Sequence, residues 1–99
     1  MSTRHAFYRR RFLNRPRHHL GAHVIASIEV ETPAKGRPYV EASVHVTDCS
    51  RAIDLDFSAG SRAEARNALH KVRLLREVLA DFEASLALTL EGVGYPRRP

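Results

Sequence analysis

The chain has 99 residues, one cysteine and a formal net charge of +5 at pH 7, which is the size of one domain near the lower limit for a core without disulfides or a partner. A single thiol cannot form an internal bridge, and the N-terminus lacks the apolar run of a signal peptide, so we expect an intracellular, cytoplasmic protein. No stretch approaches the roughly 20 apolar residues that span a bilayer, which excludes a transmembrane role.

The positive charge is concentrated in residues 1–21. This segment contains six arginines and no acid, whereas residues 22–99 hold ten Lys or Arg against eleven Asp or Glu. The asymmetry predicts a basic N-terminal arm that engages an acidic or polyanionic partner, and a solvated tail that aids solubility is the alternative. Within the arm, residues 4–15 are the candidate for a short helix that Pro16 ends. The residues assigned to partner binding are Arg9, Arg10, Arg11, Phe12, Arg15 and Arg17.

Three stretches, at residues 22–31, 39–48 and 52–57, alternate apolar and polar side chains, which is typical of half-buried strands. Turn signals at residues 32–37 and 48–51 separate them and indicate an antiparallel meander. The side chains predicted to face inward are Val24, Ala26, Ile28, Val30, Val40, Ala42, Val44, Val46, Ile53, Leu55 and Phe57.

A long amphipathic helix follows. Ser61 and Glu64 form a capping box that starts the helix at Arg62, and Gly92, Gly94 and Pro96 end it. Steps of three and four place one apolar stripe on a single helical face. Its members are Ala65, Ala68, Val72, Leu75, Leu79, Phe82, Leu86 and Leu90. The sequence therefore predicts an α+β fold, βββα, with a three-stranded antiparallel sheet packed against this helix, an arm at 1–21, a domain at 22–91 and a tail at 92–99.

The helix is longer than the sheet that we expect it to cover. About 30 helical residues span roughly 45 Å, whereas strands of seven to ten residues reach only about 23 to 34 Å. The overhanging end needs another cover, which is either the aromatic arm residues or a second chain. We favour a homodimer. Its predicted interface comprises Leu75, Leu79, Phe82, Leu86 and Leu90.

The outward face of the sheet collects carboxylates and imidazoles, a combination that suits metal binding or acid–base chemistry. The side chains concerned are Glu29, Glu31, Glu41, Asp54, Asp56, His23 and His45. An ordinary solvated face is the favoured interpretation, because no phosphate-binding glycine loop or nucleophile elbow accompanies them. Adjacent His18 and His19 point to opposite sides of an extended chain and do not chelate on their own, and Cys49 is interpreted as a turn residue. We therefore predict no catalytic, cofactor-binding or metal-binding residues and a protein that is not an enzyme.

Four helix arginines lie within about 80° of one another on the polar face, at spacings of four, seven and three residues. These residues, Arg62, Arg66, Arg73 and Arg76, form the candidate phosphate-binding set if the protein binds nucleic acid. Glu77 and Glu83 share that side, so a salt-bridged exposed face is the alternative.

The segment Gly60-Ser-Arg-Ala-Glu-Ala-Arg-Asn-Ala-Leu resembles the start of the last helix of double-stranded RNA-binding domains. That resemblance implies phosphate contacts at Arg62 and Arg66, although the third strand and the helix are longer here. The whole chain is similar to small uncharacterised proteins encoded by actinobacterial phages. Four segments carry this similarity: Phe12-Leu-Asn-Arg-Pro-Arg-His-His, Asp48-Cys-Ser-Arg, Leu55-Asp-Phe and Arg66-Asn-Ala-Leu-His-Lys. It implies a viral origin and a setting in the host cytoplasm.

Folds of four strands and a dimerising helix, as in single-stranded-DNA-binding transcription cofactors, rank lower because they bind DNA on the sheet, which is acidic here. The leading hypothesis is a non-enzymatic phage interaction protein, a homodimer that engages a host or viral protein through its arm. The alternative is nucleic-acid binding through arm and helix arginines without sequence readout. Metal or hydrolytic chemistry on the acidic face is a third possibility.

Overall fold

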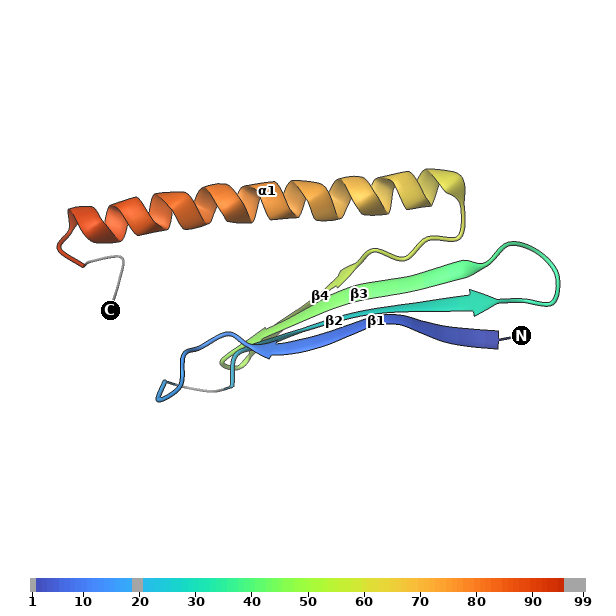
Figure 1. The fold of residues 1–99 in the computed structure, drawn as a ribbon, viewed down its shortest axis with the longest axis horizontal. Coiled ribbons are helices and arrows are strands. Elements are labelled where there is room, and N and C mark those ends of the chain that lie inside the picture. Colours follow the sequence, from blue (N-terminus) through green and yellow to red (C-terminus); the bar gives the residue numbers. More distant parts are fainter. Residues whose placement is uncertain (1, 19–20, 96–99) are drawn as a thin grey trace. The chain divides into compact units, whose positions relative to one another are not determined.

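The computed structural model describes residues 2–18 and 21–95 and contains four strands followed by one helix. The elements are β1 (Ser2–Phe12), β2 (His23–Thr32), β3 (Tyr39–Asp48), β4 (Arg51–Asp56) and α1 (Arg62–Gly92). The strands form one antiparallel sheet in the order β1-β2-β3-β4 (Figure 1). The chain divides into two compact units, residues 1–69 and 70–99, and each is described by itself. The α+β class and the C-terminal helix are confirmed, but the predicted number of strands, three, is wrong.

The additional strand is β1, which occupies most of the predicted arm and replaces the short helix predicted at residues 4–15. It pairs with β2 from Ser2 opposite Thr32 to Phe12 opposite His23, and the register shifts between His5 and Phe7. An edge strand exposed on both faces has no apolar side to mark it, and a bulge further disturbs the period of two. Tyr8 and its neighbouring aromatic residues supplied β-propensity without alternation.

The pairing of β2, β3 and β4 confirms the predicted faces. Val24 lies opposite Val46, and Val46 opposite Ile53, so the predicted inward residues share one face of the sheet. Gly36, with a φ of 97°, lies in the turn between β2 and β3. The loop between β3 and β4 has two residues, and its first, Cys49, adopts a φ of 56°.

The sheet encloses very little core in the single chain. Among the described residues, the buried hydrophobic side chains are Ala22, which is 2% exposed, and Phe57, which is 9% exposed. Hydrogen bonds fix the backbone at both places, from the Leu13 amide to the Ala22 carbonyl and from the Phe57 amide to the Ala42 carbonyl. The side chains of β2 and β3 are mostly half-buried, so much of the apolar face stays in contact with solvent.

The connection from β4 to α1 is closely hydrogen-bonded. Val40 and Ala59 exchange two backbone hydrogen bonds of 2.8 Å, which extend the sheet beyond the end of β4. The Ser61 hydroxyl accepts the Glu64 amide at 3.1 Å, and the Glu64 carboxylate accepts the Gly60 amide at 2.8 Å. The predicted capping box is thus present, with its return bond one residue earlier than in the usual pattern, and the predicted helix start is confirmed.

The helix ends in a Schellman motif. The Tyr95 amide donates to the Leu90 carbonyl at 2.8 Å and the Gly94 amide to the Glu91 carbonyl at 3.2 Å, while Gly94 adopts a φ of 104°. This is the backbone conformation that glycine adopts without steric cost. The stop signal predicted at Gly94 is therefore confirmed, α1 ends at Gly92, and Pro96 lies outside the described residues.

Candidate partner-binding surface

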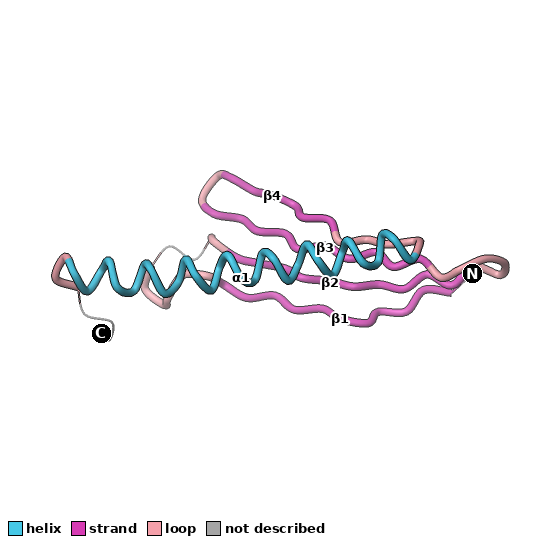
Figure 2. The backbone as a smooth tube through the Cα atoms, turned by 90° about the horizontal axis from the view of Figure 1, so that it is seen from above, coloured by secondary structure: helices cyan, strands magenta, loops and turns pink. Residues whose placement is uncertain are grey.

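β1 carries the predicted arginines along one edge of the sheet. Arg9 lies opposite Ala26 and therefore shares the apolar face, while Arg10 lies opposite Ile25 and projects from the other face. Every residue of β1 is exposed. Figure 2 shows β1 as the outermost strand, next to β2. Guanidinium groups therefore flank both faces of an edge whose outer side pairs with no described strand.

Aromatic rings hold two of these arginines. The Arg9 Cζ atom lies 5.6 Å from the centroid of the Phe7 ring on one face, and the Arg10 Cζ atom lies 5.2 Å from the Phe12 ring on the other. Both distances fall within the range of cation–π attraction. Each guanidinium therefore lies over a neighbouring ring while its residue stays exposed.

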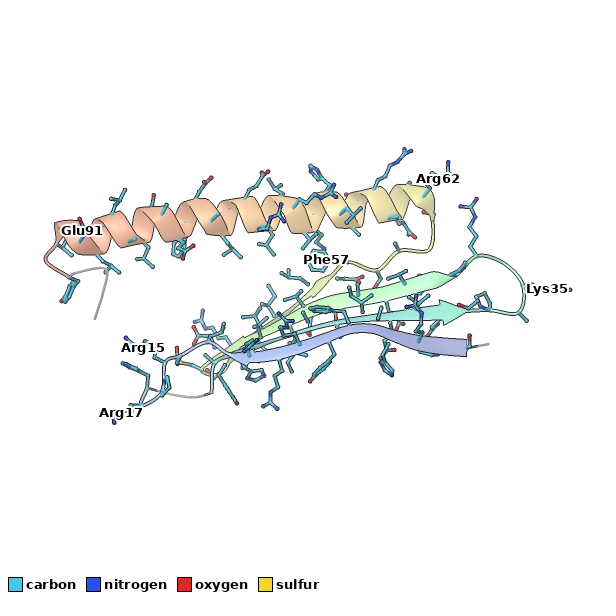
Figure 3. The ribbon with its side chains drawn as sticks, viewed as in Figure 1. Arg15, Arg17, Lys35, Phe57, Arg62 and Glu91 are labelled. Atoms are coloured by element: carbon cyan, nitrogen blue, oxygen red, sulfur yellow. The ribbon has the colours of Figure 1, made fainter. Side chains whose placement is uncertain are left out.

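Arg15 and Arg17 follow β1 in the loop before β2 (Figure 3). Arg17 has a φ of 78°, and Arg15 lines an open hollow of about 470 Å³ together with Leu13, Asn14 and His18. The structure therefore places Arg9, Arg10, Arg11 and Phe12 on one strand and the two remaining predicted residues beyond its end.

On the face that carries Arg10, three rings form a continuous row across β1, β2 and β3, which we call the aromatic–imidazole row: Phe12, His23 and His45. The Phe12 and His23 ring centroids are 6.4 Å apart in an edge arrangement, and those of His23 and His45 are 6.0 Å apart. Such rings offer surface on which another planar group can stack.

Hydrogen bonds set the orientation of both imidazoles. His23 Nδ1 lies 2.9 Å from the Gly21 carbonyl and donates to it. His45 Nδ1 lies 2.6 Å from the Asp54 carboxylate, and His45 Nε2 lies 2.9 Å from the Thr47 hydroxyl. The order hydroxyl, imidazole, carboxylate occurs in nucleophilic catalysis. Here the network holds the last ring of the row at both nitrogens.

The glutamates lie toward the other end of the same face. Glu29 is directly opposite Glu41, and its carboxylate pairs with His5 Nδ1 at 3.3 Å. The face predicted to collect carboxylates and imidazoles therefore has its glutamates near the β2–β3 turn and the aromatic–imidazole row at the other end, where the exposed Asp54 carboxylate adjoins His45. The carboxylates of Glu29 and Asp54 have His5 and His45, rather than the β1 arginines, as their partners in these contacts.

The predicted helix residues are all accessible on α1. The four candidate phosphate-binding arginines, Arg62, Arg66, Arg73 and Arg76, are exposed. None of the residues of α1 is buried, and the predicted interface includes Leu79 at 56% and Phe82 at 61% exposure. The other predicted interface residues are Leu75, which is half-exposed, and Leu86 and Leu90, which are exposed.

The histidines in the first 23 residues are distributed over several elements. His5 lies in β1, His18 in the loop and His23 in β2, while His19 falls outside the described residues. Within the part of the chain that the structure describes, no three His, Cys, Asp or Glu side chains converge as a metal site.

Over the same residues, no helix combines the length and the apolar character needed to cross a membrane. Cys49 is exposed in its turn.

Protein-family models, curated proteins and solved structures gave no match to this chain. The pairing of β1 with β2, and with it the aromatic–imidazole row, was not predicted from the sequence. Phe12 and His23 lie at the two ends of the ten-residue connection between β1 and β2, and their pairing follows only once residues 2–12 are known to form a strand antiparallel to β2. The contact with His45 required the register of β3.

Proposed function

We propose that this chain is a non-enzymatic binding protein that receives an acidic, extended segment of a partner protein along β1, and that it acts as a homodimer through α1. The phage resemblance would make that partner a host or viral protein. The observation that carries the proposal is the edge strand β1, on which Arg9 and Arg10 are held over Phe7 and Phe12 at 5.6 and 5.2 Å.

The backbone of β1 favours a protein partner. An edge strand presents amides and carbonyls in the spacing of another strand, and an added strand satisfies them with main-chain hydrogen bonds. Side chains that alternate along such a strand meet the arginines on both faces, and opposite charges directly across a strand pair are stabilising.

The charge of β1 selects the partner. The strand carries Arg4, Arg9, Arg10 and Arg11 and no acid, so the β1 strand of another copy would bring like charges together. An acidic segment gives complementary pairs instead. The partner surface at β1 is therefore distinct from the self-association surface that we assign to α1.

A ten-residue peptide with glutamates at three successive central positions, whose carboxylates project from both faces of an added strand, is a direct probe. The triple variant Arg9→Gln, Arg10→Gln, Arg11→Gln should bind this peptide about tenfold more weakly, because each lost cross-strand pair contributes about 0.5 kcal/mol. The matched control Arg62→Gln, Arg66→Gln, Arg73→Gln removes the same charge from α1 and should change affinity by less than about threefold. Fluorescence anisotropy at low salt measures both.

Strand addition also has a backbone signature. Hydrogen exchange of β1 amides should slow when the peptide binds, because the outer amides gain partners. Equal weakening by the two triple variants, with no protection in β1, would show nonspecific attraction by net charge and would refute the proposal.

Single-stranded nucleic acid is the second candidate, and the aromatic–imidazole row favours it. The element order of four strands and a helix is that of the single-stranded-DNA-binding cofactors that the sequence analysis ranked low. The glutamates lie away from the row, and the one carboxylate beside it, that of Asp54, is hydrogen-bonded to His45. In such complexes bases stack on aromatic rings while nearby arginines contact phosphates. Here Arg10 would contact phosphates, in addition to the predicted contacts of Arg62 and Arg66. Phe12→Leu should then weaken binding of oligothymidine, whereas Phe7→Leu, on the other face of the sheet, should not. Such complexes bind more tightly at low salt than at high salt. Absence of binding at about 50 mM salt would therefore remove this candidate.

A further inference from the structure

The two halves of α1 carry opposite charge. Residues 62–76 hold five basic side chains and one acid, whereas residues 77–92 hold four acids and no lysine or arginine. Arg62 and Glu91 lie at opposite ends of the helix (Figure 3). A helix with this distribution matches a second copy only when that copy runs in the opposite direction.

The same distribution opposes the dipole of the helix. Basic side chains are favourable near a C-terminus and acidic ones near an N-terminus, but the last turn of α1 contains no basic residue and its C-terminal half is entirely acidic. All charged side chains of residues 77–92 are acidic, so, apart from Glu64 in the first turn, the charge pattern does not stabilise the isolated helix. An antiparallel neighbour compensates it, because each basic half then lies beside an acidic half and the two dipoles oppose each other.

The apolar stripe repeats every seven residues, with steps of three and four, from Ala65 to Leu86; the next position of the repeat is Thr89, and Leu90 lies beside it. In heptad notation, the a positions are Ala65, Val72, Leu79 and Leu86, and the d positions are Ala68, Leu75, Phe82 and Thr89. Sustained a and d positions form the seam of a coiled coil. None of these residues is buried in the single chain.

We propose that the homodimer forms through an antiparallel pair of α1 helices in which the two Glu77 residues lie at the same level. This inference rests on the homodimer in the proposed function and specifies its geometry. In an antiparallel pair an a position lies level with a d position of the other helix. Around Glu77, Leu75 meets Leu79 of the partner subunit and Val72 meets Phe82 of the partner subunit.

Side-chain volumes support this register. The outer layers set Ala68 against Leu86 of the partner subunit and Ala65 against Thr89 of the partner subunit, so small residues face larger ones. A parallel pair would align alanine with alanine in these layers and Phe82 with Phe82 of the partner subunit. It would also place each charged half beside a half of the same sign, which is destabilising.

Disulfide trapping in a Cys49→Ser background distinguishes the orientations. An oxidised equimolar mixture of Leu75→Cys and Leu79→Cys chains should yield mainly the mixed disulfide, because these positions meet only in the antiparallel register. In a parallel dimer each variant alone would form its own disulfide, and that result would overturn the inference while leaving a homodimer in place.

A second measurement leaves the stripe intact. Spin labels at Asn67→Cys, also with Cys49→Ser, should lie about 30 Å apart in the antiparallel dimer, since residue 67 is ten residues from Glu77 at 1.5 Å per residue. A parallel pair would bring them within about 20 Å, because helix axes pack 8–10 Å apart, and would overturn the inference. A monomer in sedimentation at micromolar concentration would overturn both this geometry and the proposed homodimer, whereas peptide binding at β1 is measured separately and would survive.

Discussion

The junction between β4 and α1 and the edge strand β1 belong to the same unit but are built in opposite ways. The junction, residues 57–64, contains the buried Phe57 and a series of specific hydrogen bonds through Ser58, Gly60, Ser61 and Glu64. β1 is held by its ladder to β2, and all its side chains are exposed. Order at the junction comes from packing and capping, whereas β1 leaves its side chains and one side of its backbone available. We expect substitutions at the junction to change stability and substitutions in β1 to change binding.

Phe57→Ala should show the largest effect in this comparison. Removing a buried phenylalanine loses its burial and leaves a cavity, which costs about 3 kcal/mol. Phe12→Ala is the matched control, because Phe12 is 58% exposed, and it should cost less than about 1 kcal/mol. Urea denaturation at one fixed protein concentration measures both. Similar losses for the two variants would contradict the contrast between junction and edge.

Gly60→Ala should have the next largest effect. A Cβ atom at this position would lie 2.8 Å from Cδ2 of Tyr39, so the ring must move, and overpacking of this kind costs about 1–2 kcal/mol. This expected loss of stability arises from contact with one side chain, that of Tyr39. In a Tyr39→Ala background the same substitution should cost less, and a double-mutant cycle measures the difference. A cost that is independent of Tyr39 would point instead to the backbone of Gly60.

The elements with a strong local signal were predictable from the sequence. Alternation identified β2, β3 and β4, and the Ser61 and Glu64 pair located the start of α1, because each pattern reflects one buried face or one cap. β1 was not predictable in this way, since Arg9 and Arg10 occupy both faces of an exposed edge and no side of the strand is apolar. The aromatic–imidazole row depends on the register of three strands, which a single-sequence pattern does not determine.

Cys49→Gly should stabilise the protein by about 1 kcal/mol, the steric cost of a left-handed backbone for a residue with a Cβ atom. Cys49 adopts a φ of 56° in the two-residue loop between β3 and β4, where glycine is preferred. Cys49→Ala is the control that separates the effect of backbone strain on stability from the effect of removing the thiol. Alanine also has a Cβ atom and therefore keeps the steric cost. A gain with alanine equal to that with glycine would show that the thiol, rather than the turn, is responsible.

The smallest expected change in stability concerns β1 itself. Replacing Arg9 and Arg11 by Gln should alter the free energy of unfolding by less than about 0.5 kcal/mol, since exposed side chains away from caps and cores contribute little. The same variant should still lose affinity for the acidic peptide, because two of the charges proposed to lie opposite its glutamates are gone. Urea denaturation and fluorescence anisotropy on one preparation report both quantities. A fall in stability that matches the loss of binding would mean that these arginines hold β1 on the sheet, and the division of roles between the edge and the junction would then be wrong.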